Sequence, residues 1–188
     1  PDSVNTNNGA QAAAKPARGS TAVKKASKKR SADAVALPDG ARKAKLPLAL
    51  APQLALLADS APTKGDWIYE IKFDGYRVLA RVDGSDVRLF TRRGHDWTSR
   101  LKHLAQAIAA LKLSNGWIDG EIVIESGQGR TDFQALQNAF DAAATADIHY
   151  LVFDLPYYAD HDLRQVPLRN RRNLLRQLMA ANTSNYLK

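Results

Sequence analysis

The stretch between Trp67 and Val82 constrains the fold more than any other part of the sequence. Apolar and polar residues alternate along it, and the pair Asp74-Gly75 interrupts the alternation. Because successive side chains of a β-strand point to opposite faces, this pattern predicts two strands joined by a turn. In the first strand, one face would carry Trp67, Tyr69, Ile71 and Phe73, and the other would carry Ile68, Glu70, Lys72 and Asp74.

Lys72 is the residue of this stretch that we expect to carry out chemistry. Its neighbours on the charged face are Glu70 and Asp74, and Arg77 follows in the second predicted strand. An amine must lose its proton before it attacks as a nucleophile, and desolvation or neighbouring cations favour that loss. The alternative is a surface hairpin with solvated charges, the usual situation for a single lysine. The fixed spacing of Lys, Asp, Gly and Arg favours the chemical interpretation.

Length and composition indicate one soluble domain with a tail, because 188 residues, 45% of them hydrophobic, suffice for a core. No apolar run reaches the length of a membrane span, and the amino terminus lacks an export signal, so we expect a cytosolic protein without membrane contact. The sequence contains no Cys, which excludes disulfides, thiolate metal sites and cysteine nucleophiles. Pro1 in place of Met suggests a piece of a longer chain.

The positive charge of the chain is concentrated at its amino terminus. The net charge is +8, of which residues 1–46 supply +7 from ten Lys and Arg and three Asp, whereas residues 47–188 supply only +1. Residues 1–46 also have few large apolar side chains and no sustained period, so we expect a flexible basic interdomain linker. It either attracts phosphates through Lys24-Lys25 and Lys28-Lys29-Arg30 or serves as a solvated tether.

The remaining pattern predicts a mixed α+β domain of antiparallel strands with helices outside. Pro47 and Pro52 interrupt the apolar run Leu46–Leu57, so we expect an extended entry with a short helix there, packed on the domain. We expect a hairpin turn at 83–86 and strands at 87–91, 117–124 and 149–155. We expect a helix through 101–111 capped by Asp96 or Thr98, a helix through 133–140 capped by Thr131 or Asp132, and a helix after Pro167.

Some polar and aromatic residues of these elements have two interpretations. Asp119 and Glu121 share a strand face that is otherwise fit for burial, and burying ionised carboxylates costs several kcal/mol unless partners or a cation compensate. Phe153 is either a core residue or a flat wall for a bound ring. His149, Leu151, Phe153 and Leu155 are expected on one face, and Arg169, Arg171, Arg172 and Arg176 on a solvated face of the last helix.

Four motifs in this order and at these separations resemble the first half of the nucleotidyltransferase motif set of ATP-dependent DNA ligases. They are Lys72-Phe-Asp-Gly-Tyr-Arg77, Thr91-Arg-Arg-Gly94, Asp119-Gly-Glu-Ile-Val123 and Tyr150-Leu-Val-Phe-Asp-Leu155. Connecting signatures of these enzymes resemble Phe133-Gln-Ala-Leu-Gln137 and Val166-Pro-Leu-Arg-Asn-Arg-Arg172. The chain is most similar to the ligase domain of the bacterial multifunctional DNA ligase D family, around Gly65-Asp-Trp67, Leu89-Phe-Thr-Arg92 and Gly94-His-Asp-Trp97.

The resemblance covers about residues 38–180 and implies a nucleotidyltransferase (ATP-grasp-like) adenylation domain with nucleotide between antiparallel sheets. Residues 47–188 would be its amino-terminal part, incomplete at the carboxyl end. The family has a second acidic motif, a lysine-rich motif and an oligonucleotide-binding barrel, which we expect after Lys188. We therefore expect that this chain alone does not complete ligation.

The activity implied by the resemblance is strand sealing in DNA repair and end joining. Lys72 would attack the α-phosphate of ATP, release pyrophosphate and form a lysyl-adenylate, and AMP would pass to a DNA 5′-phosphate before a 3′-hydroxyl displaces it. The implied metal is Mg²⁺ or Mn²⁺. The implied partners are nicked or broken double-stranded DNA, the Ku end-binding protein and fused polymerase and nuclease domains, in a bacterial cytoplasm at the nucleoid.

The same resemblance implies a role for each site residue. Glu70 and the Ile71 backbone would read the adenine edge, and Phe153 would stack on the ring. Nucleotide contacts are implied for Glu70, Ile71, Lys72, Arg77, Arg92, Glu121 and Phe153, and metal contacts for Asp74 and Glu121. RNA ligases and messenger-RNA capping guanylyltransferases share the Lys-x-Asp-Gly pattern and remain alternatives. A further alternative is a non-catalytic DNA-binding fragment that relies on the basic tail.

Overall fold

Three long strands with alternating apolar residues form the centre of an antiparallel sheet. The computed structural model describes residues 35–180 and 182–188. The sheet has six strands in the order β1-β8-β7-β4-β2-β3. Their bounds are Arg42–Lys43 for β1, Tyr76–Asp83 for β2, Asp86–Thr91 for β3, Asn115–Val123 for β4, His149–Tyr158 for β7 and His161–Asp162 for β8. Strands β5 (Glu125–Ser126) and β6 (Arg130–Thr131) form a separate pair.

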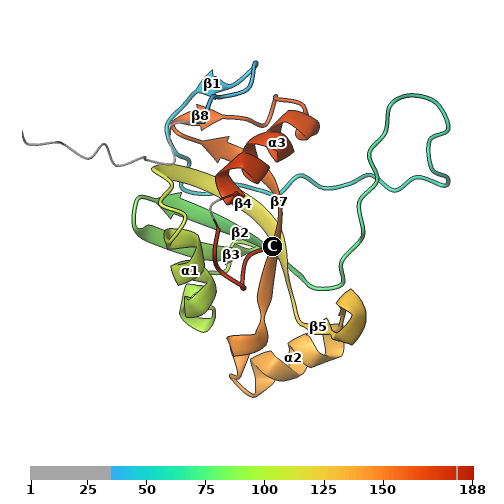
Figure 1. Cartoon of the computed structure of the whole chain (residues 1–188), viewed down its shortest axis with the longest axis vertical. Helices are drawn as coiled ribbons and strands as arrows, with labels where there is room; N and C mark the ends of the chain where they lie inside the picture. The colour runs from blue at the N-terminus through green and yellow to red at the C-terminus, as the bar shows by residue number, and fades with distance from the viewer. Residues whose placement is uncertain (1–34, 181) are drawn as a thin grey trace, which may run out of the picture.

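The helices contribute to one apolar core with the sheet, which confirms the predicted α+β class. The described α-helices are α1 (Lys102–Ala109), α2 (Phe133–Asp141) and α3 (Leu168–Met179), and short 3-10 turns lie at Thr98–Arg100, Gly127–Gly129 and Thr145–Asp147. Buried side chains from all three helices pack with Val78, Ile118 and Tyr150 of the sheet. Figure 1 shows α1 and α3 on the viewer's side of the sheet. Across the described ranges, no helix is long and apolar enough to span a membrane.

Several local signals specify the element ends as predicted. Asp83 and Asp86 pair at the hairpin that joins β2 to β3. Asp132 caps α2, since its Oδ1 accepts a hydrogen bond of 2.9 Å from the Ala135 N–H. The helix predicted after Asp96 begins later, at Lys102, because a 3-10 turn occupies the preceding residues. Each correct signal involves residues a few positions apart.

The opposite face of the sheet carries a smaller apolar cluster covered by residues 44–53, which we call the strap. Leu79, Trp117 and Tyr157 form the cluster, and Leu46 and Leu50 of the strap pack on it. The Tyr157 hydroxyl donates to the Ala44 carbonyl at 2.6 Å, and the Trp117 indole N–H donates to the Pro47 carbonyl at 3.0 Å. The strap therefore crosses the sheet face held by apolar contacts and by side chains that bind its backbone.

The predicted strand before Asp74 and the predicted short helix within Leu46–Leu57 are both wrong. Residues 44–75 contain no strand or helix, and Figure 1 shows much of this segment as a long excursion away from the sheet. Large apolar side chains there are exposed: Leu48, Leu54, Leu56, Leu57, Trp67, Ile68, Tyr69 and Ile71. A strand persists only when a neighbour pairs with its backbone, and no described segment pairs with residues 67–73.

The described part of the expected linker belongs to the folded unit. Strand β1 lies within residues 35–46 and pairs with β8, and the Ala44 N–H donates to the Asp160 carbonyl at 2.9 Å. Val35 and Leu37 pack against the main core. The folded unit therefore includes residues before the expected boundary at residue 47. The rest of the expected linker, residues 1–34, lies outside the described residues.

Strand β7 carries two β-bulges that sequence alternation does not reveal. Its register against β4 shifts on both sides of the Asp119–Asp154 pair, and β7 has the extra residue each time. Tyr150 and Leu155 consequently share the main core although they are five positions apart. The prediction that Leu155 lies on the same face as His149 and Leu151 is therefore wrong, and the bulges bring Asp154 opposite Asp119.

Candidate functional site

Arg77 and Asp119 form a bidentate ion pair on the sheet face opposite the helices. Arg77 Nε donates to Asp119 Oδ1 at 2.5 Å, and Nη2 donates to Oδ2 at 2.7 Å. Asp119 is only 1% exposed, and burial raises the pKa of its carboxyl although the Arg77 guanidinium opposes that rise. The predicted compensation for a carboxylate on this face is thus found in a guanidinium from the neighbouring strand.

Glu121 links the site to the turn that follows Lys72. Strand pairing places Glu121 opposite Arg77, and Glu121 Oε1 accepts a hydrogen bond of 3.1 Å from the Gly75 N–H. Burial raises the pKa of Glu121 and the charge of Asp74 adds to that rise, whereas the Gly75 N–H and the charges of Arg77 and Lys72 oppose it. The pKa of this carboxyl lies above its usual value, and one backbone donor and two cations offset part of the effect of burial.

Lys72 lies at the open side of this arrangement. Its side chain is 89% exposed, and its Nζ is 4.0 Å from Asp74 Oδ1. The Asp74 N–H donates to Thr131 Oγ1 at 3.2 Å, so the turn is attached to β6 as well as to β4. The Lys72 side chain is therefore solvated. The backbone that follows it is held by hydrogen bonds at Asp74 and Gly75.

Phe153 is half-buried and lies beside Arg77, outside both buried apolar clusters of the described residues. The Arg77 guanidinium carbon is 4.5 Å from the centre of the Phe153 ring, a cation–π distance. Of the two sequence interpretations, this position favours an aromatic wall at the site over a core residue. Arg77, Glu121 and Phe153 thus come together from β2, β4 and β7.

Glu70 and Ile71 lie in the exposed segment before the turn. Glu70 Oε1 forms an ion pair with Arg172 of α3, and Asp66 Oδ2 pairs with Arg169 of the same helix at 2.7 Å. Ile71 is 77% exposed. The structure therefore connects this segment to α3, and Glu70 contacts that helix rather than the group around Arg77.

Arg92 lies in the turn directly after β3. The last residue of that strand, Thr91, pairs with Val78, which places the turn beside the Arg77 end of β2. Arg92 is exposed and forms no hydrogen bond or ion pair with any described residue. The backbone of Arg92 is therefore next to the site. Its side chain does not contact Asp119 or Gln53, the residues that bind Arg77.

Arg171 is a site residue that the sequence pattern did not assign correctly. It was expected on a solvated helix face, yet it is 3% exposed and forms a bidentate pair with Asp154 at 2.7 and 2.8 Å. Its Nη2 also donates to Gln53 Oε1 at 3.0 Å. The spacing contained the signal, because Arg171 precedes the buried Leu174, Leu175 and Leu178 by three, four and seven positions.

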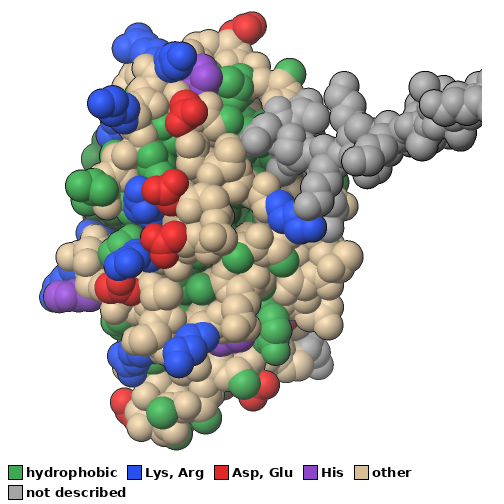
Figure 2. All heavy atoms as spheres, turned by 90° about the vertical axis from the view of Figure 1, so that its left-hand side faces the viewer, with side chains coloured by type: hydrophobic (Ala, Val, Ile, Leu, Met, Phe, Trp, Pro, Cys, Tyr) green, Lys and Arg blue, Asp and Glu red, His purple; other side chains and the backbone are tan. Residues whose placement is uncertain are grey.

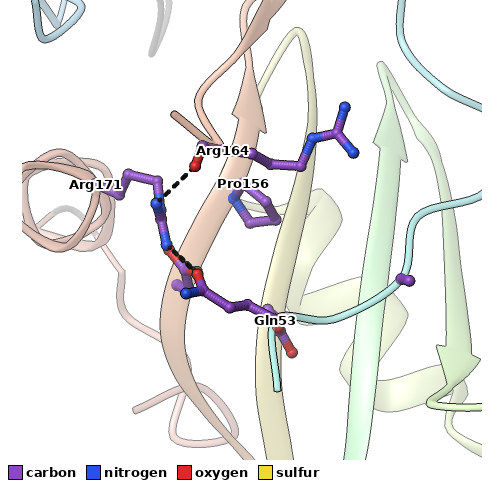
Figure 3. A pocket seen from close by; sticks show the side chains of 7 residues that line it. Gln53, Pro156, Arg164 and Arg171 are labelled. Carbon is purple, nitrogen blue, oxygen red and sulfur yellow. Dashed lines mark hydrogen bonds and ion pairs between the residues drawn. The ribbon is translucent and has the colours of Figure 1, made fainter. Parts of the chain in front are cut away.

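A cavity of about 250 Å³ lies between the strap and this second ion pair. Figure 3 shows Gln53, Pro156, Arg164 and Arg171 around it, and its other lining residues are Ala51, Asp119 and Asp154. Asp119 and Asp154 are opposite each other in β4 and β7, so the two ion pairs are adjacent. Both carboxylates of the cavity wall are already paired with arginine.

Asp74 and Glu121 are the carboxylates of the site that a divalent cation could use. Among the residues that the structure describes, no three His, Cys, Asp or Glu side chains gather into a metal site. Mg²⁺ is commonly held by one or two carboxylates together with phosphates of a substrate. The two carboxylates near the Gly75 turn therefore fit a cation that arrives with a phosphorylated ligand.

Charges of both signs are interspersed on another face of the molecule. Figure 2 shows Lys and Arg side chains among Asp and Glu side chains there. At the hairpin between β2 and β3, Arg88 pairs with Asp86 at 3.5 Å and Arg81 with Asp83 at 2.9 Å. This mixture agrees with the near balance of charge in residues 47–188 and gives no single-sign patch on the face shown.

The fold and site define a class of protein once they are compared with known families. The family described as ATP dependent DNA ligase domain matches residues 52–187. The chain therefore belongs to the family of ATP-dependent DNA ligase domains.

Among its relatives is the multifunctional non-homologous end joining protein LigD of Pseudomonas aeruginosa, which is 47% identical over 146 residues. The match covers 78% of this chain and 17% of that protein. LigD of Mycobacterium tuberculosis is 33% identical over 135 residues, with 71% and 17% covered. The chain thus spans a minor part of these relatives.

Two solved structures share the fold. The crystal structure of the ligase domain from M. tuberculosis LigD matches with a TM-score of 0.52 and 31% identity, over 63% of this chain and 38% of that one. A mycobacterial DNA ligase D complexed with ATP and MES matches with a TM-score of 0.51 and 32% identity, with the same coverage of 63% and 38%. These matches confirm the predicted ligase family and fold class.

Proposed function

We propose that this chain is the amino-terminal part of the adenylation domain of a LigD-type DNA ligase, and that Lys72 forms the lysyl-adenylate. The observation that carries the proposal is the position of Lys72. It precedes a turn fixed to Glu121, and strands β2, β4 and β7 bring Arg77, Glu121 and Phe153 to the same end of the sheet face. The amine nitrogen would attack the α-phosphorus of ATP, the bond to the β-phosphate oxygen would break, and pyrophosphate would leave.

The exposure of Lys72 defines what nucleotide binding has to supply. Desolvation favours the neutral amine that a nucleophilic attack requires, whereas the Lys72 side chain is 89% exposed. We infer that desolvation of Lys72 accompanies nucleotide binding, with Arg77 near the phosphates or ribose. Asp74 and Glu121 would hold Mg²⁺, which neutralises the triphosphate and aligns its oxygens for in-line displacement.

The remaining contacts of the nucleotide are proposals of the same kind. Phe153 would stack on adenine. In the structure, the Arg77 guanidinium lies against the Phe153 ring. Glu70 and the Ile71 backbone would read the adenine edge after Glu70 leaves Arg172. Arg92, exposed beside the Arg77 end of β2, would contact phosphate or ribose oxygens.

The names of the relatives support a proposal for the wider role of the parent protein. LigD proteins are named for non-homologous end joining, so we propose nicked or broken double-stranded DNA as the substrate that receives AMP. The Ku end-binding protein and fused polymerase and nuclease domains are the further partners proposed, in the bacterial cytoplasm at the nucleoid. Residues 1–34 would belong to the basic linker that precedes the domain.

The test is covalent labelling of the full-length protein. After incubation with ATP labelled at the α-phosphate and Mg²⁺, wild type is expected to carry label, which Lys72→Ala abolishes. Lys64→Ala is the matched control, because Lys64 lies in the same exposed segment and should retain labelling. Transfer of the label to nicked DNA tests the second step. Labelling from GTP alone, or undiminished labelling in Lys72→Ala, would contradict the proposal.

A further inference from the structure

A ring of neighbouring polar groups, each joined to the next by a hydrogen bond except the Asp119–Asp154 carboxylate pair, links helix α3 to Arg77. Arg77 binds Asp119, Asp119 is opposite Asp154 across the sheet, and Asp154 binds Arg171 of α3. Gln53 of the strap completes the ring, because its side-chain Oε1 accepts from Arg171 at 3.0 Å and its backbone carbonyl accepts from Arg77 Nη2 at 3.3 Å. Figure 3 shows the part of this ring that runs from Arg171 to Gln53.

The two carboxylates of the ring need separate cations. Asp119 is 1% and Asp154 5% exposed, and like charges on opposite strands destabilise each other. Burial raises the pKa of Asp119, Arg77 lowers it, and the charge of Asp154 raises it by a smaller amount. If Arg171 lost its charge, Asp154 would be a second buried anion with Arg77 as the nearest cation available in the ring.

Arg171 has the geometry to fix Asp154 in one position. Its Nε and Nη2 bind the two oxygens of Asp154, while Nη1 donates to the Val166 carbonyl at 2.7 Å. The Leu155 N–H also donates to Asp154 Oδ1 at 2.7 Å. A planar guanidinium satisfies these acceptors together, which a lysine ammonium does not.

We propose that Arg171 is a positioning residue for Arg77: by neutralising Asp154, it leaves Arg77 bound to Asp119. This inference rests on the proposed function, in which Arg77 contacts the nucleotide. Arg171 itself touches no nucleotide in this scheme. Its effect passes through charge balance within the ring, so removing the negative charge of Asp154 as well should restore what removing the positive charge of Arg171 disturbs.

The experiment compares lysyl-adenylate formation by full-length variants. In Arg171→Gln the unpaired Asp154 competes for Arg77, and we expect the KM for ATP to rise about tenfold at pH 8 with a smaller change in kcat. In Asp154→Asn/Arg171→Gln both charges of the pair are removed together, so the KM should return to a value near wild type. Arg176→Gln, an exposed change on the same helix, is the matched control.

The pH profile separates this role from a general loss of structure. The charged groups around Asp154 are Asp119, Arg77, Arg171 and Arg164, which also lines the cavity. In Arg171→Gln, a proton bound by Asp154 replaces the missing cation, so the KM defect should shrink as pH falls and grow as pH rises. Wild type and the double variant should lack this trend, and thermal unfolding verifies that each variant is folded.

Different outcomes separate failure of the inference from failure of the proposed function. A double variant whose KM stays as high as that of folded Arg171→Gln would indicate a structural role and overturn the inference. An unchanged KM in Arg171→Gln would overturn it as well. If Arg171→Gln does not fold, a double variant that folds with wild-type KM supports the charge-balance argument, and one with a raised KM overturns it. If wild type forms no lysyl-adenylate, the proposed function fails, and the inference fails with it.

Discussion

The backbone N–H of Gly75 donates a hydrogen bond of 3.1 Å to Glu121 Oε1. The backbone at Gly75 and strand β4 approach so closely here that no side chain fits at Gly75. A Cβ added to Gly75 would lie 2.2 Å from the Ile122 carbonyl oxygen. Gly75 is not among the glycines with positive φ. The glycine of the Asp-Gly pair is thus required for this close approach, rather than for the turn conformation that the sequence suggested.

Gly75→Ala is expected to displace the turn that carries Lys72. Because the clash is with backbone, the variant should lose roughly 1–3 kcal/mol of unfolding free energy, as overpacked sites do. Urea unfolding measures the stability, and labelling by ATP should show slower lysyl-adenylate formation. Gly127→Ala is the control, since nothing lies within 4 Å of a Cβ built there. Equal effects of the two substitutions would contradict the close-packing argument.

The ion pairs between α3 and the exposed segment should affect local mobility more than global stability. Glu70–Arg172 and Asp66–Arg169 join partly or fully exposed side chains, and such pairs contribute little to global stability because water screens them. We expect Arg169→Gln/Arg172→Gln to change the unfolding free energy little, while chymotrypsin cleaves faster after Trp67 and Tyr69. Mass spectrometry locates the cleavage.

The control for these tethers is Arg176→Gln, which removes a charge from α3 without removing a contact to the segment. Its cleavage rate should equal that of wild type. Unchanged cleavage in the double variant would indicate that the two ion pairs do not restrain residues 66–70.

The parts of the fold that sequence predicted correctly depend on local interactions. The Asp83–Asp86 hairpin, the Asp132 cap and the start of α3 after Pro167 each involve neighbouring residues. The strand predicted at 67–73 failed because alternation shows which face a residue would take and not whether a partner strand exists. In β7 the bulges changed the face of Leu155, since register is set by β4.

In the candidate site too, sequence motifs identified individual residues, whereas their long-range pairings required the structure. Lys72, Arg77, Glu121 and Phe153 came from motifs, and the sheet brings the last three together. The pairing of Asp119 with Arg77 joins residues 42 positions apart, and that of Gln53 with Arg171 joins residues 118 positions apart. Helical spacing marks Arg171 as core-facing, but its partner follows only from the position of α3 beside β7.

Removing the Tyr157 hydroxyl should loosen the strap. In Tyr157→Phe the Ala44 carbonyl loses its 2.6 Å partner, and a net hydrogen-bond contribution of about 1 kcal/mol should disappear from the unfolding free energy. Tyr150→Phe should cost more, because the fully buried Tyr150 hydroxyl contacts the Val78 and Ile118 carbonyls. Denaturant unfolding of both variants checks the order, and a greater loss in Tyr157→Phe would contradict it.

His149 should make stability depend on pH at mildly acidic values. Burial lowers the pKa of His149, and the nearby Lys188 lowers it further, while Glu125 and Asp147 act in the opposite direction. Its buried Nδ1 has no hydrogen-bond partner among the described residues. As pH falls from about 6.5 through the lowered pKa, the unfolded chain takes up a proton that the folded chain does not, so stability is lost.

We therefore expect the unfolding free energy of wild type to fall as pH decreases through this window. His149→Gln should flatten this dependence, because glutamine does not titrate. His95→Gln, at an exposed position, should leave the slope of wild type unchanged. Urea unfolding between pH 5 and 8 provides the measurement, and a slope in His149→Gln equal to that of wild type would assign the dependence to another group.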